Sequence, residues 1–115
     1  MRTVVLIATG GTIAMKVDPE LNAPRPVFDG DELLALRPDI AGLARLEVRN
    51  LFNMPSEYMG PEQWVLLQRA VNAELAREEV AGVIVSHGTD TMEESAWFLD
   101  LTLDSPKPVV LVGGF

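Results

Sequence analysis

Residues that could take part in catalysis stand at three places in the 115-residue chain, each beside a glycine or a proline. The first is Thr9 to Thr12, which reads Thr-Gly-Gly-Thr. The second is Ser56 with Glu57, and the third is His87 to Thr91, which reads His-Gly-Thr-Asp-Thr. A threonine hydroxyl becomes a nucleophile when a neighbouring group takes its proton, and amide hydrolysis also needs donors for the developing oxyanion. Glycine lets backbone N–H groups approach a ligand closely. Together, the three groups could bind and cleave a small amide.

The charged and hydroxyl side chains in these groups match the two ends of an amino acid. The carboxylates of Asp90 and Glu57 could hold an ammonium group, and Ser56 with nearby backbone donors could hold a carboxylate. A small amino acid that carries a side-chain amide would therefore fit. On the residues alone, binding without turnover is as compatible with this array as catalysis is.

Two other interpretations of the same groups stay open at this point. A Thr-Gly-Gly-Thr turn after a strand could cradle a phosphate, although the G-x-G-x-x-G spacing and a Walker lysine are both missing. Residues 87–91 could serve only as a turn and a helix cap, and Thr12 could likewise be a capping residue. Ser56 and Glu57 could be ordinary solvated loop residues.

The rest of the chain alternates apolar runs with amphipathic stretches. The apolar runs predict strands near residues 3–8, 45–51, 81–86 and 108–113. Helices are expected near residues 31–36, 60–79 and 91–103. Residues 15–29 hold three prolines and are predicted to form a loop.

This alternation predicts a single α/β domain over residues 1–115. We expect a parallel, Rossmann-like sheet of about four strands, joined by right-handed crossovers, with helices on both faces. In such a sheet the carboxyl ends of all strands share one edge, and ligands bind there, near the point where the strand order reverses. The three groups of polar residues all follow predicted strands, so we expect them to meet at that edge.

Composition removes several classes of function. Nine basic and seventeen acidic residues give a net charge of −8, and the basic stripe that a nucleic-acid-binding protein needs is missing. The sequence has no cysteine and one histidine, which excludes thiolate chemistry and a histidine-rich metal site. The apolar run from Val4 to Ala8 is too short for a signal core or a membrane span. We therefore expect a cytoplasmic protein that binds neither nucleic acid nor membrane.

Two stretches of the sequence resemble the signatures of the bacterial L-asparaginase/glutaminase family. Residues 3–15 read TVVLIATGGTIAM and resemble the first signature, and residues 82–103 read GVIVSHGTDTMEESAWFLDLTL and resemble the second. Their separation, and the KPVVLVGG that follows, also match. The resemblance implies hydrolysis of L-asparagine, and possibly of L-glutamine, to the acid and ammonia through a covalent acyl-enzyme. It implies neither a metal nor an organic cofactor.

The resemblance also implies roles for individual residues. Thr12 matches the nucleophile, and Thr89 and Asp90 match the threonine and aspartate of the second catalytic group. Asp90 also matches the anchor for the substrate's α-amino group. The implied substrate-binding set comprises Gly11, Ser56, Glu57, Gly88, Thr89 and Asp90. Ser56 matches the serine that binds the α-carboxylate. His87 could act as a general base, but we favour a structural role because the resemblance gives the chemistry to Thr89 and Asp90.

The sequence departs from the family pattern in two ways. The family places a catalytic tyrosine in the loop after the first signature, whereas the only tyrosine here is Tyr58, to which the role is not transferred. The family's catalytic lysine would fall beyond Phe115, and the only lysines are Lys16 and Lys107. Lys107 precedes its strand, so it should lie at the opposite edge of the sheet. The sequence therefore predicts a fragment or a short relative in which the family's C-terminal domain is absent.

These departures leave three functional hypotheses. The first is an L-asparaginase-type amidohydrolase with a threonine nucleophile. The second is a truncated, inactive remnant that at most binds an amino acid. The third is the asparaginase-like subunit of a tRNA-dependent amidotransferase, which would need a partner subunit. A homo-oligomer is expected if the rest of the family fold is present.

Overall fold

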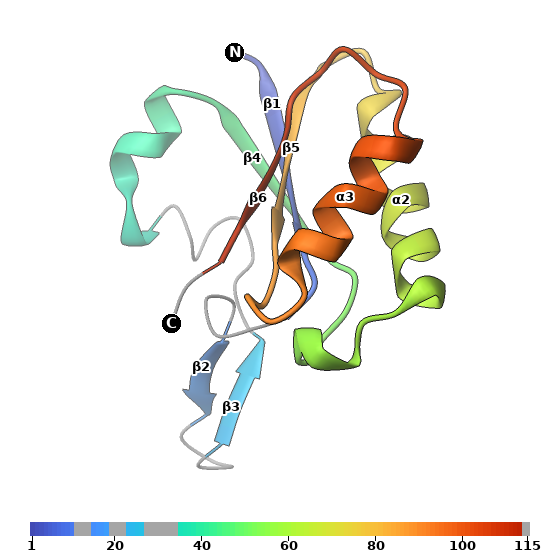
Figure 1. The fold of residues 1–115 in the computed structure, drawn as a ribbon. Coiled ribbons are helices and arrows are strands. Elements are labelled where there is room, and N and C mark those ends of the chain that lie inside the picture. Colours follow the sequence, from blue (N-terminus) through green and yellow to red (C-terminus); the bar gives the residue numbers. More distant parts are fainter. Residues whose placement is uncertain (11–14, 19–22, 27–34, 114–115) are drawn as a thin grey trace.

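The apolar run that follows Arg2 forms the centre of a parallel sheet. We analysed a computed structural model that describes residues 1–10, 15–18, 23–26 and 35–113 (Figure 1). Strand β1 (Thr3–Ala8) pairs with β4 (Arg45–Asn50) on one side and with β5 (Val80–Ser86) on the other. Strand β6 (Val109–Val112) pairs with β5, so the order is β4-β1-β5-β6, with all strands parallel. The predicted four-stranded parallel α/β fold is confirmed, with every strand end within one residue of that expected.

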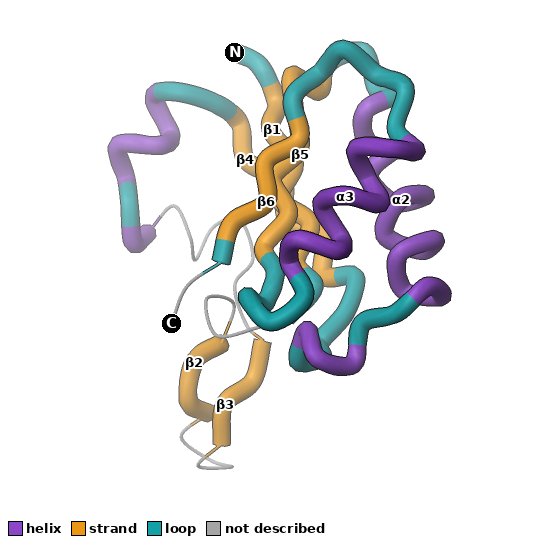
Figure 2. The backbone as a smooth tube through the Cα atoms, in the orientation of Figure 1, coloured by secondary structure: helices purple, strands orange, loops and turns teal. Residues whose placement is uncertain are grey.

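Two α-helices cover one face of this sheet. Helix α2 (Pro61–Leu75) and helix α3 (Met92–Thr102) lie side by side on the same face (Figure 2). Two short 3-10 helices, η2 (Pro38–Gly42) and η3 (Ser56–Tyr58), occupy connections. Among the described residues, the expectation of helices on both faces is thus met on one face only. Most of the predicted helix near residues 31–36 lies outside the described residues, although residues 35 and 36 are helical.

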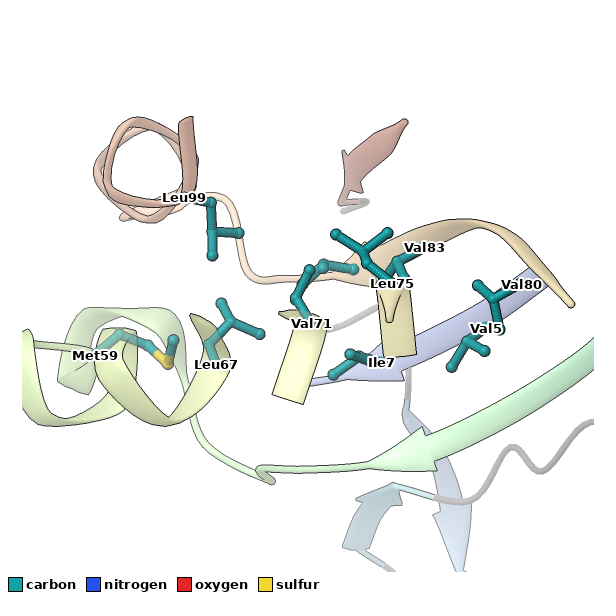
Figure 3. Packing of buried hydrophobic residues seen from close by; sticks show 10 residues of the cluster. Val5, Ile7, Met59, Leu67, Val71, Leu75, Val80, Val83 and Leu99 are labelled. Atoms are coloured by element: carbon teal, nitrogen blue, oxygen red, sulfur yellow. The ribbon is translucent and has the colours of Figure 1, made fainter. Parts of the chain in front are cut away.

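The core lies between the sheet and these two helices. Alternate residues of a strand point to the same face, so Val5 and Ile7 of β1 and Val83 and Val85 of β5 all face α2. Helix α2 meets them with Leu67, Val71 and Leu75, an apolar stripe at a spacing of four residues, and α3 adds Leu99 (Figure 3). Burial of each such side chain stabilises the fold by about 1.5–3 kcal/mol. The helices are thereby fixed against the strands whose carboxyl ends carry the polar residues.

Helix α2 is shorter than the sequence predicts. Pro61 occupies its first turn, where proline is favoured, and the Gly60 N–H donates to Gln63 Oε1 at 2.9 Å. The helix ends at Leu75, whereas it was expected to reach about residue 79. The chain turns instead, because the Val80 N–H donates to the Arg77 carbonyl and the Thr3 N–H donates to the Glu79 carbonyl. Entry into the sheet therefore overrides the helix propensity of residues 76–79.

The predicted loop over residues 15–29 is wrong in part. Strand β2 (Met15–Asp18) pairs antiparallel with β3 (Ala23–Pro26) to form a separate two-stranded ribbon. The prolines in this segment favoured a loop because proline cannot donate to a strand ladder. In a two-stranded ribbon, however, each strand has an outer edge where no donor is required, so proline is compatible with pairing.

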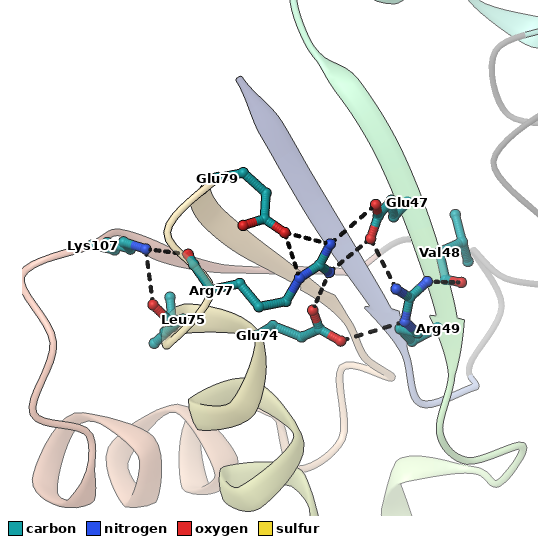
Figure 4. A network of polar contacts seen from close by, with 8 residues as sticks. All are labelled: Glu47, Val48, Arg49, Glu74, Leu75, Arg77, Glu79 and Lys107. Atoms are coloured by element: carbon teal, nitrogen blue, oxygen red, sulfur yellow. Dashed lines mark hydrogen bonds and ion pairs between the residues drawn. The ribbon is translucent and has the colours of Figure 1, made fainter. Parts of the chain in front are cut away.

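Ion pairs and a lysine tie the elements together at the edge where the strands begin (Figure 4). Arg77 contacts Glu47 of β4 at 2.8 Å, Glu74 of α2 at 2.7 Å and Glu79 at 3.0 Å. Hydrogen bonds from the Arg77 guanidinium hold the pKa of the Glu47 carboxyl below its usual range. Lys107 Nζ donates to the carbonyls of Leu75 and Arg77 at 2.9 and 2.7 Å and so caps the end of α2. Lys107 therefore lies at the opposite edge from the candidate site residues, as its position before β6 predicts.

Candidate active site

The strand order places the switch point of the sheet between β1 and β5. After β1 the chain goes to β4 on one side, and after β5 it goes to β6 on the other. The two connections therefore run to opposite sides of the switch point, and α/β sheets bind their ligands at the carboxyl edge beside such a point. Thr9 and Gly10 follow β1, and residues 87–91 follow β5, so two of the three predicted groups begin beside the switch point.

Gly10 brings the loop after β1 onto the loop after β4. Its φ is +107°, in a region that only glycine adopts readily. A Cβ at this position would lie 2.7 Å from both the backbone nitrogen and the carbonyl oxygen of Met54. The Met54 N–H donates to the Thr9 carbonyl at 3.3 Å, and the Thr9 hydroxyl donates to the Ser86 carbonyl at 2.8 Å. Close backbone contact thus joins the first and second loops.

Ser56 joins the second loop to the third. Its side chain is 3% exposed, which rules out the solvated-loop interpretation for this residue. Ser56 Oγ accepts a hydrogen bond from the Asp90 N–H at 3.1 Å, and the Thr91 hydroxyl donates to the Ser56 carbonyl at 2.6 Å. Gly88 packs so closely that a Cβ on it would lie 2.7 Å from Ser56 Oγ. Ser56, Gly88 and Asp90 therefore lie together, as the sequence predicts.

Some of the remaining predicted residues lie at the rim, meaning the carboxyl edge of the sheet, and others lie outside the described residues. The side chains of Glu57, Thr89 and Asp90 are exposed. Exposed carboxylates on the rim are open to a cationic group of a ligand. Gly11 and Thr12, the predicted nucleophile among them, lie outside the described residues.

Two contributions to the site were not predicted from the sequence. Residues 87–91 could provide the cap of α3, and Thr91 occupies the N-cap position, but its side chain makes no capping hydrogen bond and donates to the Ser56 carbonyl instead. Gly113, after β6, packs against the third loop, since a Cβ there would lie 2.8 Å from the His87 carbonyl. Neither contact has a local signal in the sequence, because each joins segments far apart in the chain.

Other features of the described residues lie away from this rim. A groove between α3 and β6 is lined by Trp97, Leu103, Val109 and Leu111, and none of the predicted site residues borders it. The part of the chain that the structure describes holds no cluster of three acidic, histidine or cysteine side chains suited to a metal ion. None of its helices has the length and apolarity needed to cross a membrane.

A parallel sheet with serine, threonine and aspartate around its switch point defines an α/β domain with a candidate ligand site at the carboxyl edge of its strands. The chain belongs to the asparaginase family, because the family profile described as "Asparaginase, N-terminal" matches residues 3–115. A crystal structure of a probable cytoplasmic L-asparaginase from Campylobacter jejuni aligns with a TM-score of 0.81 and 40% identity, over 98% of this chain and 35% of that one.

The curated relatives are named as subunits of an amidotransferase, whereas the matching crystal structure is that of a probable L-asparaginase. The chain is 42% identical over 110 residues to a glutamyl-tRNA(Gln) amidotransferase subunit from Methanothermobacter thermautotrophicus. It is 47% identical over 111 residues to the protein of the same name from Haloquadratum walsbyi. Each match covers 96% of this chain and 25% of the relative, so the chain spans about a quarter of the length of these proteins.

Proposed function

We propose that this chain carries the amide-hydrolysing site of a glutamyl-tRNA(Gln) amidotransferase. The observation that carries the proposal is the contact between the Asp90 N–H and Ser56 Oγ, which joins two predicted substrate-binding residues at the switch point. Membership of the asparaginase family supports amide hydrolysis, and the curated relatives favour the amidotransferase setting. This setting replaces a free L-asparaginase as the leading hypothesis.

The geometry around Ser56 suits the two charged ends of an amino acid. Because Ser56 Oγ already accepts a hydrogen bond from the Asp90 N–H, its own proton is available to donate to a substrate carboxylate. The exposed Asp90 carboxylate follows directly in the chain and can accept from the substrate's ammonium group. A ligand held at both ends would leave its side-chain amide free for attack.

The proposed reaction then proceeds through an ester of Thr12. The Thr12 hydroxyl gives up its proton and its oxygen attacks the carboxamide carbon, while glycine-rich backbone N–H groups stabilise the oxyanion. The C–N bond breaks, and the nitrogen takes a proton and leaves as ammonia. Water attacks the resulting ester, which releases the carboxylic acid and restores the Thr12 hydroxyl. Thr89 is the second catalytic hydroxyl, as the family resemblance implies.

Ammonia release tests this site directly. We expect the purified chain to release ammonia from L-asparagine or L-glutamine and Thr12→Ala to abolish the release. Thr102→Ala is the matched control, because the Thr102 hydroxyl only donates to the Phe98 carbonyl within α3. Equal rates for Thr12→Ala and the unsubstituted chain would remove Thr12 from the reaction. Binding of L-aspartate in calorimetry without any turnover would instead support the inactive-remnant hypothesis.

A second assay separates the amidotransferase role from that of a free L-asparaginase, which the match to the Campylobacter jejuni structure favours. With its partner proteins supplied, an amidotransferase component should support Thr12-dependent conversion of glutamyl-tRNA(Gln) to glutaminyl-tRNA(Gln). A free asparaginase would release ammonia at the same rate with or without partners and would support no conversion. The net charge of −8 leaves the tRNA contacts to the partners in this proposal.

A further inference from the structure

The only histidine in the sequence is a buried residue at the start of the third loop. His87 follows β5 and is 0% exposed. Its Nδ1 atom lies 2.6 Å from the Gly88 carbonyl oxygen, and its Nε2 atom lies 2.8 Å from the Ser95 hydroxyl of α3, which is also fully buried. The ring thus lies between Gly88 of the third loop and helix α3, which follows the loop.

These two partners fix the proton position on the ring. A carbonyl oxygen can only accept, so Nδ1 must carry the proton and donate to Gly88. In a neutral ring Nε2 is then an acceptor, and the Ser95 hydroxyl donates to it.

The hydrogen bond to Gly88 also determines how the next peptide group points. The Gly88 carbonyl and the Thr89 N–H belong to one planar trans peptide, so they point in opposite directions. When His87 holds the carbonyl inward, the Thr89 N–H is directed away from the buried ring. Gly88 has no side chain to limit its rotation, so its own conformational preferences do not set this orientation.

We propose that His87 is a positioning residue, which as the neutral Nδ1–H tautomer fixes the Gly88–Thr89 peptide and so aims Thr89 and Asp90 at the substrate. This role deepens the proposed function and rests on it for the identity of the substrate. The ring does not touch the reacting atoms in this proposal and exchanges no proton with them. Ser95 holds the ring in place from α3.

The tautomer can be measured without a ligand or turnover. Nitrogen-15 labelling of the chain gives imidazole signals from a single histidine, so assignment is unambiguous. We expect long-range proton–nitrogen correlations to show a protonated Nδ1 and an unprotonated Nε2 at neutral pH. Signals of the Nε2–H tautomer, or of a ring protonated at both nitrogens, would overturn the proposal.

Two conservative variants then separate positioning from packing. In asparagine the amide nitrogen is two bonds from Cβ, like Nδ1, so His87→Asn keeps a donor for the Gly88 carbonyl. In glutamine the amide oxygen is three bonds from Cβ, like Nε2, and can accept from the Ser95 hydroxyl, so His87→Gln keeps the partner of Ser95 and loses the donor for the Gly88 carbonyl. Both variants lose the ring, so both should melt at a lower temperature.

We expect the amide resonances of Thr89 and Asp90 to move in His87→Gln and to stay near their original positions in His87→Asn. Equal displacement in both variants would contradict a positioning role.

Ligand affinity provides the final comparison, with L-aspartate as the probe. We expect the dissociation constant to rise by about tenfold in His87→Gln, which is the scale of one lost hydrogen bond, and by less than about twofold in His87→Asn. An equal loss of affinity for L-aspartate in both variants would contradict the positioning role. If the unsubstituted chain binds no L-aspartate, the proposed function fails, and the tautomer and amide resonances still decide the role of His87.

Discussion

The backbone N–H of Asp90 donates to the hydroxyl oxygen of Ser56 across a distance of 3.1 Å, although 34 positions in the chain separate the two residues. This hydrogen bond joins the loop after β4 to the loop after β5 at the carboxyl edge of the sheet. It holds together a hydroxyl suited to a carboxylate and a carboxylate suited to an ammonium group. The pairing is therefore both a structural link and the basis of the proposed amino-acid site.

Replacement of Ser56 should separate these two contributions. We expect Ser56→Ala to lower the free energy of unfolding by about 1 kcal/mol, because the Asp90 N–H loses its acceptor, and to weaken L-aspartate binding by about tenfold. Ser105→Ala is the matched control, since Ser105 Oγ accepts from the Lys107 N–H at 3.2 Å, outside the site. Calorimetry and urea unfolding measure the two effects. Equal loss of affinity in both variants would argue against a binding role for Ser56.

Gly10 should tolerate no side chain. Gly10→Ala places a Cβ 2.7 Å from the Met54 backbone at a φ of +107°, so we expect the free energy of unfolding to fall by at least about 2 kcal/mol. Gly42→Ala is the control, because a Cβ there meets no atom within 4 Å, and its effect should stay within about 0.5 kcal/mol. Urea unfolding of both variants checks the difference. A Gly10→Ala protein as stable as the unsubstituted chain would contradict the described loop contact.

Lys107 should contribute to stability and leave ligand binding unchanged. Lys107→Met removes two donors from the carbonyls at the end of α2, so we expect a loss of about 1–2 kcal/mol in the free energy of unfolding. Because Lys107 lies at the edge where the strands begin, affinity for L-aspartate should not change. A large loss of affinity without a loss of stability would mean that Lys107 acts at the site after all.

Acid should weaken the ion-pair cluster around Arg77. The pKa of Glu47 is lowered, chiefly by its hydrogen bond with Arg77, so the folded state favours the ionised carboxylate. This contribution is present above the ordinary value of 4.5 and is lost as the pH falls through the lower folded-state pKa. We expect the free energy of unfolding to fall over this acid range and Glu47→Gln to flatten the dependence. Glu78→Gln is the control, because Glu78 makes no ion pair among the described residues. An unchanged pH dependence in Glu47→Gln would rule out this cause.

The strands and the long helices could be predicted from the sequence, because the patterns that indicate them are local. Apolar runs bounded by glycine or proline predict β1, β5 and β6, and the stripe of Leu67, Val71 and Leu75 predicts the buried face of α2. Where the helix ends was not predictable, because residues 76–79 suit a helix and only their contacts with the sheet and with Lys107 turn the chain. The paired strands within residues 15–29 were missed because proline is compatible with a ribbon edge.

The sequence by itself determined which chemical groups the chain carries, the alternation of strands and helices, and the resemblance that implies roles for Thr12, Thr89 and Asp90. A parallel sheet also predicts that the loops share an edge, because all carboxyl ends point the same way. Only the tertiary structure decided that the Ser56 hydroxyl accepts from the Asp90 N–H and that the Thr91 side chain bonds to Ser56 and makes no capping hydrogen bond. It also decided that the His87 ring contacts both the Gly88 carbonyl and the Ser95 hydroxyl. A hydrogen bond requires its donor and acceptor to be placed to within a few tenths of an ångström, and no local propensity encodes such a placement of distant segments.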